Sequence, residues 1–346
     1  MNRQPFCKLS DPQTYIACNW NLCEDHEARA HWVGFFKRHL DTILKLGVTC
    51  SNAATNAPDR AGACREEFFD TFDRYHASPW RHEWVSILTL DEWRDGLLRK
   101  HGFEDSFLDL KNRENAAALP LLPEVCRGID ALKGAEQLQA IIEGVFAGNI
   151  FDMGAEATAK QFMHGGPDFF ATRNRLPSRP WLIDQYDHFA KKLTTTGYKK
   201  VVFFIDNAGS DFLLGAIPMM RYLAKSGSQI ILAANERPTL NDMTIRDVRT
   251  WWPKILETEP SLSGLPISFV STGTGEPLID LAKVSDELNT AAADADLVVL
   301  EGMGRGVESN LDAAFSCDAL NLAMLKDEAV SKRVGGKLYD VVCRFR

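Results

Sequence analysis

Polar side chains that can bind a metal or a phosphate follow four apolar segments in the second half of the chain. The residues at these strand ends are Asp206 with Asn207, Asn235 with Glu236 and Arg237, Glu301 with Gly302, and Lys326. In open α/β sheets, ligands bind outside the carboxyl ends of the strands. Asp, Asn and Gly are also ordinary turn and helix-cap residues, so each position taken alone has a structural explanation. All four together, on what should be one edge of a sheet, favour a binding site.

Asp206 and Asn207 offer a carboxylate and an amide carbonyl. These are hard oxygen ligands that suit Mg²⁺ or Mn²⁺ and accept other divalent ions. Two ligands do not hold a metal alone, and we predict the third to be Asp242, in the loop after the next strand. Asp242 or its neighbour Asn241 has an alternative role as the N-cap of the helix that follows. Sparse protein ligation leaves metal positions open for water and for a phosphate oxygen.

Two basic residues are predicted to neutralise a bound phosphate. Lys326 would act as a point charge, and Arg305 through its planar fork. Arg305 belongs to the glycine-rich segment GMGRG at 302–306, which lacks the spacing of a dinucleotide fingerprint, and no Walker A sequence is present. We expect these glycines to let backbone N–H groups approach a phosphate closely, not to hold a nucleotide cofactor.

Strands that alternate with helices must position these residues. Short runs rich in β-branched and aromatic residues predict strands at 199–206, 228–235, 267–273, 296–302, 320–326 and 337–345. Helices are predicted at 209–227, where Pro218 would introduce a kink, and at 241–256 and 277–294. The alternation implies an α/β fold with a mainly parallel sheet covered on both faces.

The first half of the chain is predicted to be all-α, with helices at 26–47, 66–80, 89–102 and 134–148. Apolar residues of the first segment recur at spacings of three and four, as in an amphipathic helix. In the third, Thr89 followed by Glu92 resembles a capping box and Gly102 a C-terminal stop. We predict an all-α domain over 1–160 and an α/β domain over 161–346, with the boundary in a Gly- and Pro-rich segment.

Charge and composition favour a small-molecule partner. The net charge is −8 and no block of Lys or Arg stands out, which argues against nucleic acid or an anionic membrane as partner. No apolar run approaches the roughly 20 residues of a membrane span, and no secretory signal is visible. The eight cysteines are scattered, as expected for reduced thiols in a cytosolic protein.

Several long motifs, in the right order, resemble the DUF89 family of metal-dependent damage-control phosphatases. They are FFIDNAGSDFLLGAIPMMRYLAKSGSQIILAANERPTLNDMT, VVLEGMGRGVESN and LNLAMLK, with GVFAGNIFDMG and RPWLID before them. The EGMGR segment indicates the subfamily that contains the C-terminal domain of pantothenate kinase 4 and stand-alone plant homologues. The resemblance implies a helical domain before a Rossmann-like α/β domain, with the metal at the carboxyl edge of the sheet.

The resemblance also bears on individual residues. The Asp–Asn pair of the family falls on Asp206 and Asn207, and its later acidic ligand falls on Asp242. With Lys326, at a basic position near the phosphate, these form the predicted catalytic set. Ala208 stands where close relatives often have Ser, so a hydroxyl contact to the substrate is missing here.

We expect further contacts to the substrate or its phosphate from a second set of residues. This set is Asn149, Asp152, Asn235, Glu301, Gly302 and Arg305. Asn149 and Asp152 come from the helical half of the chain in the segment AGNIFDMG. Their part in the resemblance implies a site between the two domains.

The substrate class that the resemblance implies is phosphomonoesters of small metabolites, with 4′-phosphopantetheine and its oxidised or damaged forms preferred. Divalent cobalt, nickel, manganese or magnesium is the implied cofactor. Asp206 has a second possible role as a nucleophile that forms an aspartyl-phosphate. A metal-activated water is the preferred route because Asp206 lacks the DxD spacing of many aspartyl-phosphate enzymes.

Three alternatives stay open from the sequence. A SAM-dependent carboxyl methyltransferase would use a similar sheet and hold its cofactor on the glycine loops. A non-catalytic phospho-ligand sensor would keep Asp206, Asn207 and Asp242 for binding alone. A purely structural subunit needs none of the polar strand ends and is the weakest of the three.

Overall fold

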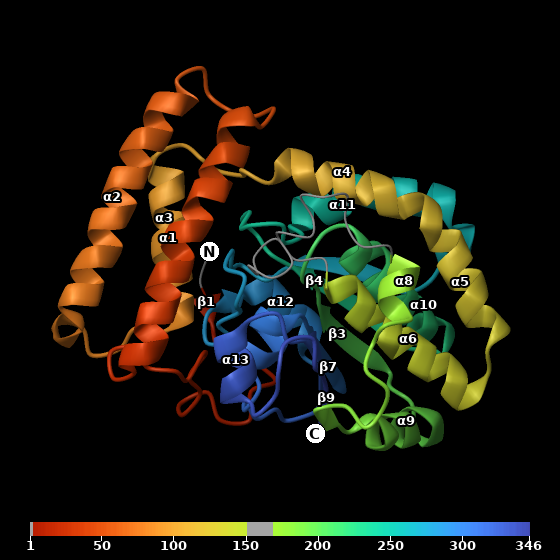
Figure 1. The fold of residues 1–346 in the computed structure, drawn as a ribbon. Helices are drawn as coiled ribbons and strands as arrows, with labels where there is room; N and C mark the ends of the chain where they lie inside the picture. Colours follow the sequence, from red (N-terminus) through yellow and green to blue (C-terminus); the bar gives the residue numbers. More distant parts are fainter. Residues whose placement is uncertain (1–2, 151–168) are drawn as a thin grey trace.

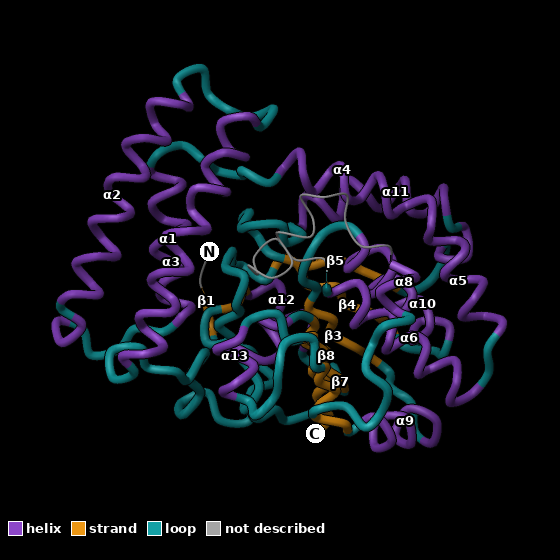
Figure 2. The backbone as a smooth tube through the Cα atoms, in the orientation of Figure 1, coloured by secondary structure: helices purple, strands orange, loops and turns teal. Residues whose placement is uncertain are grey.

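A seven-stranded sheet forms the centre of the molecule in the computed structural model, which describes residues 3–150 and 169–346 (Figures 1 and 2). Its strand order is β2–β9–β8–β7–β3–β4–β5. The strands are β2 (Ile183–Asp184), β3 (Lys200–Phe204), β4 (Gln229–Ala234), β5 (Ile267–Ser271), β7 (Leu297–Glu301), β8 (Asp318–Met324) and β9 (Val341–Phe345). Neighbouring strands from β8 to β5 run parallel, and β9 lies antiparallel to β8. The predicted α/β fold class is confirmed.

Helices cover both faces of this sheet, as the continuous apolar strands predict. Side chains of β3 alternate between two cores. Val201 and Phe203 pack with α6 (Gly134–Asn149) and α10 (Ile217–Lys225), whereas Val202 and Phe204 face the opposite layer with α12 (Asp286–Ala292). The helices on and beside the sheet are α8 (Phe169–Arg173), α9 (Tyr186–Thr195), α10 (Ile217–Lys225), α11 (Ile245–Thr258), α12 (Asp286–Ala292) and α13 (Glu328–Arg333).

The N-terminal helices are α1 (His26–Thr49), α2 (Ala57–Ala77), α3 (Ile87–Lys100), α4 (Leu108–Ala118), α5 (Leu122–Ala131) and α6 (Gly134–Asn149). Figure 1 shows α1, α2 and α3 as a separate bundle beside the sheet. Their apolar faces share a core with residues that follow the strands, including Leu278 and Met303. Helices α5 and α6 share a core with the sheet itself. The domain limits 1–160 and 161–346 stay a prediction, and residues 151–168 lie outside the described part.

Two details of the helix prediction are wrong. The capping box of α3 begins at Ser86, whose hydroxyl accepts from Thr89 N, so Thr89 is its third helical residue and Glu92 is not part of the box. The helix expected over 277–294 is limited to Asp286–Ala292. Before it, β6 (Val284–Ser285) pairs with β1 (Arg3–Gln4), and Ser285 caps α12 by accepting from Leu288 N. A partner distant in sequence thus overrides the local preference.

The segment predicted as a helix at 209–227 is divided in two. Asp211–Ala216 forms a wide π-helical turn that continues directly into α10. Pro218, which has no N–H to donate, lies in the first turn of α10, just after this junction. A second π-helical turn, Gly304–Ser309, follows β7. Such turns are uncommon and are often found at functional sites.

None of the helices within residues 3–150 and 169–346 combines the length and the apolar character that crossing a membrane requires.

Glycine allows α6 to lie directly against the first π-helical turn. A Cβ on Gly148 would lie 2.8 Å from Ser210 O and 2.9 Å from Asp211 Cα. We expect Gly148→Ala to lower the free energy of unfolding by about 1–3 kcal/mol, the usual cost of overpacking. Urea denaturation measures this change.

Gly128→Ala on α5 is the matched control, because a Cβ there meets no atom within 4 Å. That variant should be neutral or stabilised by about 0.5–1 kcal/mol, since alanine favours a helix over glycine. Equal stabilities for the two variants would show that the close approach of α6 is not a constraint.

Candidate active site

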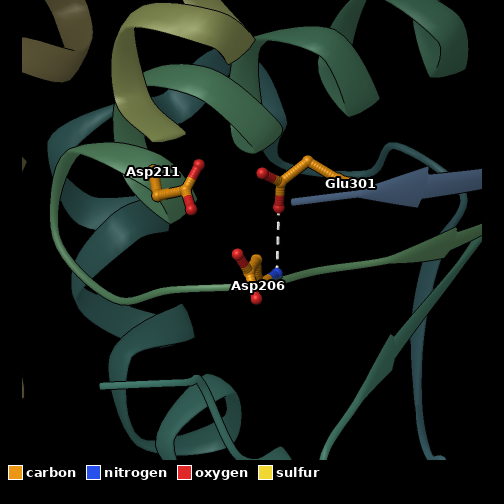
Figure 3. Close-up of side chains that lie close together, drawn as sticks. All are labelled: Asp206, Asp211 and Glu301. Carbon is orange, nitrogen blue, oxygen red and sulfur yellow. Dashed lines mark hydrogen bonds between the residues drawn. The ribbon is translucent and has the colours of Figure 1, made fainter. Parts of the chain in front are cut away.

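Two neighbouring parallel strands bring the first pair of acidic residues together. β3 and β7 are paired in register, so Asp206 just after β3 and Glu301 at the end of β7 meet at the carboxyl edge. The backbone N–H of Asp206 donates to Glu301 Oε2 at 2.9 Å, the dashed line in Figure 3. The strand-end arrangement predicted from the sequence is present.

A third carboxylate, not predicted from the sequence, joins this pair. Asp211 lies at the start of the π-helical turn, and its side chain faces Asp206 and Glu301 (Figure 3). One carboxylate oxygen from each of the three lies within 4.8 Å of the others. Asp211 is fully buried, and no hydrogen-bond donor in the described residues reaches its Oδ1. The available signal was an acidic residue five positions after Asp206, in an otherwise apolar helical segment.

Asn149, the last residue of α6, connects the three carboxylates. Its Nδ2 lies 3.2 Å from Asp206 Oδ2, 3.0 Å from Asp211 Oδ2 and 3.1 Å from Glu301 Oε1. Lys326 Nζ donates to the backbone carbonyl of Asn149 at 2.7 Å. The end of α6 and Lys326, two residues after β8, are therefore both tied to the cluster.

Asp242 reaches the site through a short bridge between two loops. Ala208 N donates to Asn241 O, and Met243 N donates to Asp206 O, both at 2.9 Å. The N-cap of α11 is Thr244, so neither Asn241 nor Asp242 has the capping role considered from the sequence. Asp242 is thereby available to the site.

Arg305 joins the two sides of the site. Its Nη1 donates to Asp206 Oδ1, and its Nη2 donates to Asp242 Oδ2 at 2.7 Å. Asn235 Nδ2 donates to the same Asp242 oxygen at 3.1 Å. The guanidinium therefore places one positive charge between two acidic residues that we predicted as metal ligands.

Negative charge exceeds positive charge in this buried group. Asp206, Asp211, Asp242 and Glu301 face two cations, and all six side chains belong to residues no more than 5% exposed. Their full charges sum to about −2 when all are ionised. The two cations that oppose them are Arg305 and Lys326. A divalent cation would balance this charge.

Burial determines the protonation of the carboxylates. Loss of solvent raises the pKa of Asp206 well above its usual range, although the Arg305 charge opposes the shift. The pKa of Glu301 is likewise raised well above its usual range by burial and by the charges of Asp211 and Asp206. Burial also raises the pKa of Asp211. Without a metal, protons must therefore supply part of the missing positive charge.

A pocket opens above this cluster, between the N-terminal bundle and the edge of the sheet. Asp206, Asn207 and Asp242 line its floor, and residues of α1 and α3 line another side. The more deeply buried Asp211 and Glu301 are not among its lining residues. The three residues predicted as metal ligands thus share one accessible surface.

The amide of Asn207 is held in one orientation. Its Nδ2 donates to Asp206 Oδ2 at 2.8 Å and to Asp211 Oδ2 at 3.0 Å. Both amide hydrogens are directed at carboxylates, so Oδ1 is the atom left to act as a ligand. Buried carboxylates, an oriented amide oxygen and excess negative charge fit a divalent cation with oxygen ligands.

Comparison with known proteins identifies the family. Residues 48–342 match the damage-control phosphatase ARMT1-like domain. The chain belongs to this family. A damage-control phosphatase of Arabidopsis thaliana is 36% identical over 355 residues, covering 99% of this chain and 96% of the relative. The resemblance seen in the sequence is confirmed, and with it the prediction of an enzyme of the phosphatase class.

Two longer relatives match nearly the whole chain. Pantothenate kinase 2 of Arabidopsis thaliana is 33% identical, with 98% of this chain and 41% of the relative covered. The 4′-phosphopantetheine phosphatase of Mus musculus is 27% identical, with 97% of this chain and 48% of the relative covered. The chain therefore spans less than half the length of these two proteins.

A solved structure of a DUF89 family protein from Pyrococcus horikoshii has the same fold. Its TM-score is 0.65 at 16% identity, with 90% of this chain and 96% of that chain covered.

Of the other residues predicted to contact the substrate, those that the structure describes do not line the pocket. Asn149 and Asn235 lie behind the acidic side chains and donate to them. Gly302 has a φ of +97°, and a Cβ there would lie 2.2 Å from Asp206 Oδ2, so glycine makes room for that carboxylate. Asp152 lies outside the described residues. The roles of these residues toward substrate stay predictions.

Replacing Asp211 by Asn removes the negative charge of the side chain and keeps its size and shape. The amide oxygen can accept the hydrogen bonds now made to Oδ2, and the new NH₂ would occupy the position that no donor reaches. We expect divalent metal binding, measured by isothermal titration calorimetry, to weaken about 10- to 100-fold, as for other residues that support metal ligands.

Asp211→Asn should also stabilise the metal-free protein at neutral pH. A carboxyl whose folded-state pKa is raised lowers stability above its unfolded pKa of about 3.9, and an amide does not. The gain should vanish near pH 3, where Asp211 is protonated in both states. Glu66→Gln, on the exposed face of α2, is the control that removes one charge elsewhere. A variant less stable than the wild type at pH 7 would contradict the assigned burial cost.

Proposed function

We propose that the protein is a metal-dependent phosphatase that hydrolyses phosphomonoesters of small metabolites, with 4′-phosphopantetheine and its oxidised or damaged forms as the substrate class. The observation that carries the proposal is the shared pocket floor of Asp206, Asn207 and Asp242. Family membership and the name of the mouse relative support the choice of substrate.

Asp206, Asn207 and Asp242 are the proposed ligands of the metal, which would be Co²⁺, Ni²⁺, Mn²⁺ or Mg²⁺. A divalent ion held there would polarise a phosphoryl oxygen and lower the pKa of a bound water. Asp211 and Glu301 support this set from below, because Asp211 orients the Asn207 amide and Glu301 accepts from the Asp206 backbone.

The basic residues of the chain would act on the charge of the phosphate. Arg305 and Lys326 bring two positive charges into a site from which water is largely excluded, where such charges stabilise a developing negative charge most effectively. The Arg305 guanidinium donates to the Pro277 carbonyl and to the carboxylates of Asp206 and Asp242, so the same group also orients these two acidic residues.

The hydrogen bonds of Asp206 favour hydrolysis by water over attack by this carboxylate. Its Oδ1 accepts from Arg305, and its Oδ2 accepts from Asn207 and Asn149. Donors on both oxygens reduce their nucleophilicity and hold the group in place. A carboxylate used in this way suits a metal ligand better than a nucleophile.

Phosphate release by metal-stripped protein tests the proposal. We expect release from 4′-phosphopantetheine only after one of the four metals is added, and a loss of about a hundredfold or more in Asp206→Ala. Glu66→Gln is again the control and should retain full activity.

A second variant tests the bridging role of Arg305. Arg305→Lys keeps the charge but not the fork that reaches both Asp206 and Asp242, so activity should fall while the charge of the site is unchanged. Full activity in Asp206→Ala, or release without any metal, would contradict the proposed function. Binding of SAM in place of phosphate release would support the methyltransferase alternative.

A further inference from the structure

One buried tryptophan at the pocket has a polar atom without a partner. Trp32 on α1 is 4% exposed, and its Nε1–H finds no hydrogen-bond acceptor among the described residues. Buried tryptophans usually satisfy this donor, because leaving it unpaired costs free energy. Trp32 also lines the pocket whose floor is formed by Asp206, Asn207 and Asp242. An acceptor on a bound molecule would satisfy this donor.

Aromatic side chains surround Trp32 on its side of the pocket. The Trp32 ring packs edge-to-face on Phe35 with centroids 5.5 Å apart, and Phe36 lies at 6.3 Å. Leu278 and Met303 line the same pocket from the loops after the strands. The charged residues Asp91, Arg94, Glu308 and Asp327 line other parts of the pocket. An apolar wall combined with a few polar groups is typical of small-molecule recognition.

The polar and apolar parts of this pocket have different origins. The floor comes from the carboxyl edge of the sheet, and the aromatic wall comes from α1. Figure 1 shows α1 in the N-terminal bundle beside the sheet. His31 on α1 also bonds Asp327, the N-cap of α13, at 3.0 Å. Because Asp327 directly follows Lys326, this contact fixes α1 beside the site.

We propose that Trp32 determines specificity by binding the alcohol portion of the substrate. Its Nε1–H donates to an uncharged acceptor, such as an amide carbonyl, while the aromatic wall contacts an adjacent apolar group. This inference rests on the proposed phosphatase function, which places the phosphate at the pocket floor.

Trp32→Phe tests the donor while keeping an aromatic ring in the wall. One hydrogen bond contributes about 1 kcal/mol, so kcat/KM for 4′-phosphopantetheine should fall about five- to tenfold, chiefly through a higher KM. Phenyl phosphate has no acceptor beyond its phosphate, and its kcat/KM should change less than about twofold. The ratio of the two values is the diagnostic quantity.

Trp93→Phe is the matched control. Trp93 lies on α3 of the same bundle, packs on Phe72 and Tyr75, and does not line the pocket. It should leave the ratio unchanged. An equal loss of kcat/KM on both substrates for Trp32→Phe would show that Trp32 acts on the phosphate or on the fold. No loss on either substrate would show that Trp32 has no role in recognition. Either result would overturn the inference about Trp32. The proposed phosphatase function would still stand if the wild-type protein released phosphate.

A measurement on the wild-type protein tests the same inference if Trp32→Phe does not fold. With ¹⁵N-labelled indole groups, we expect one of the eight tryptophan Nε1–H resonances to move downfield when pantetheine, the dephosphorylated product, is added. Slower hydrogen exchange of the same resonance should accompany the shift. If no indole resonance responds at saturating pantetheine, the inference is wrong. No wild-type phosphate release with any metal would instead count against the proposed function.

Discussion

The burial of four carboxylates, whose combined charge exceeds that of Arg305 and Lys326 beside them, is the constraint on which the rest of the site depends. Water is largely excluded from Asp206, Asp211, Asp242 and Glu301, so their charge must be met by donors, protons or a cation. The amides of Asn149 and Asn207 supply donors, and Arg305 and Lys326 supply charge. The remaining negative charge favours the binding of a divalent ion. Without the ion, the same buried charge makes the protein less stable than it would be with uncharged side chains at these positions.

Several elements of the fold lie close together around the four carboxylates and supply the groups that contact them. β3 and β7 set Asp206 beside Glu301, and the π-helical turn after β3 brings Asp211 to them. Glycine at 148 lets α6 deliver Asn149, and glycine at 302 makes room for the Asp206 carboxylate. The N-terminal bundle contributes the aromatic wall of the pocket, so the pocket is formed by two parts of the chain that are distant in sequence.

Much of this arrangement could be predicted from the sequence, because polar residues that end buried parallel strands must meet at one edge. Asp206 and Glu301 were found in this way. Asp211 was missed because it lies in an apolar segment predicted as a helix. The spacing of apolar residues does not show that a π-helical turn there directs Asp211 toward the strand ends. The helix predicted at 277–294 failed because β6 pairs with β1, about 280 residues distant in sequence. The contacts of Asn149 depend on tertiary packing that no local pattern contains.

The most direct test of the account is the position of the metal. A crystal of the protein soaked in Mn²⁺ would locate the ion by its anomalous scattering. We predict a single peak on the pocket side, bonded to Asp206, Asn207 Oδ1 and Asp242. A peak enclosed between Asp211 and Glu301, or no peak at a saturating Mn²⁺ concentration, would contradict the assignment of the pocket floor as the metal centre.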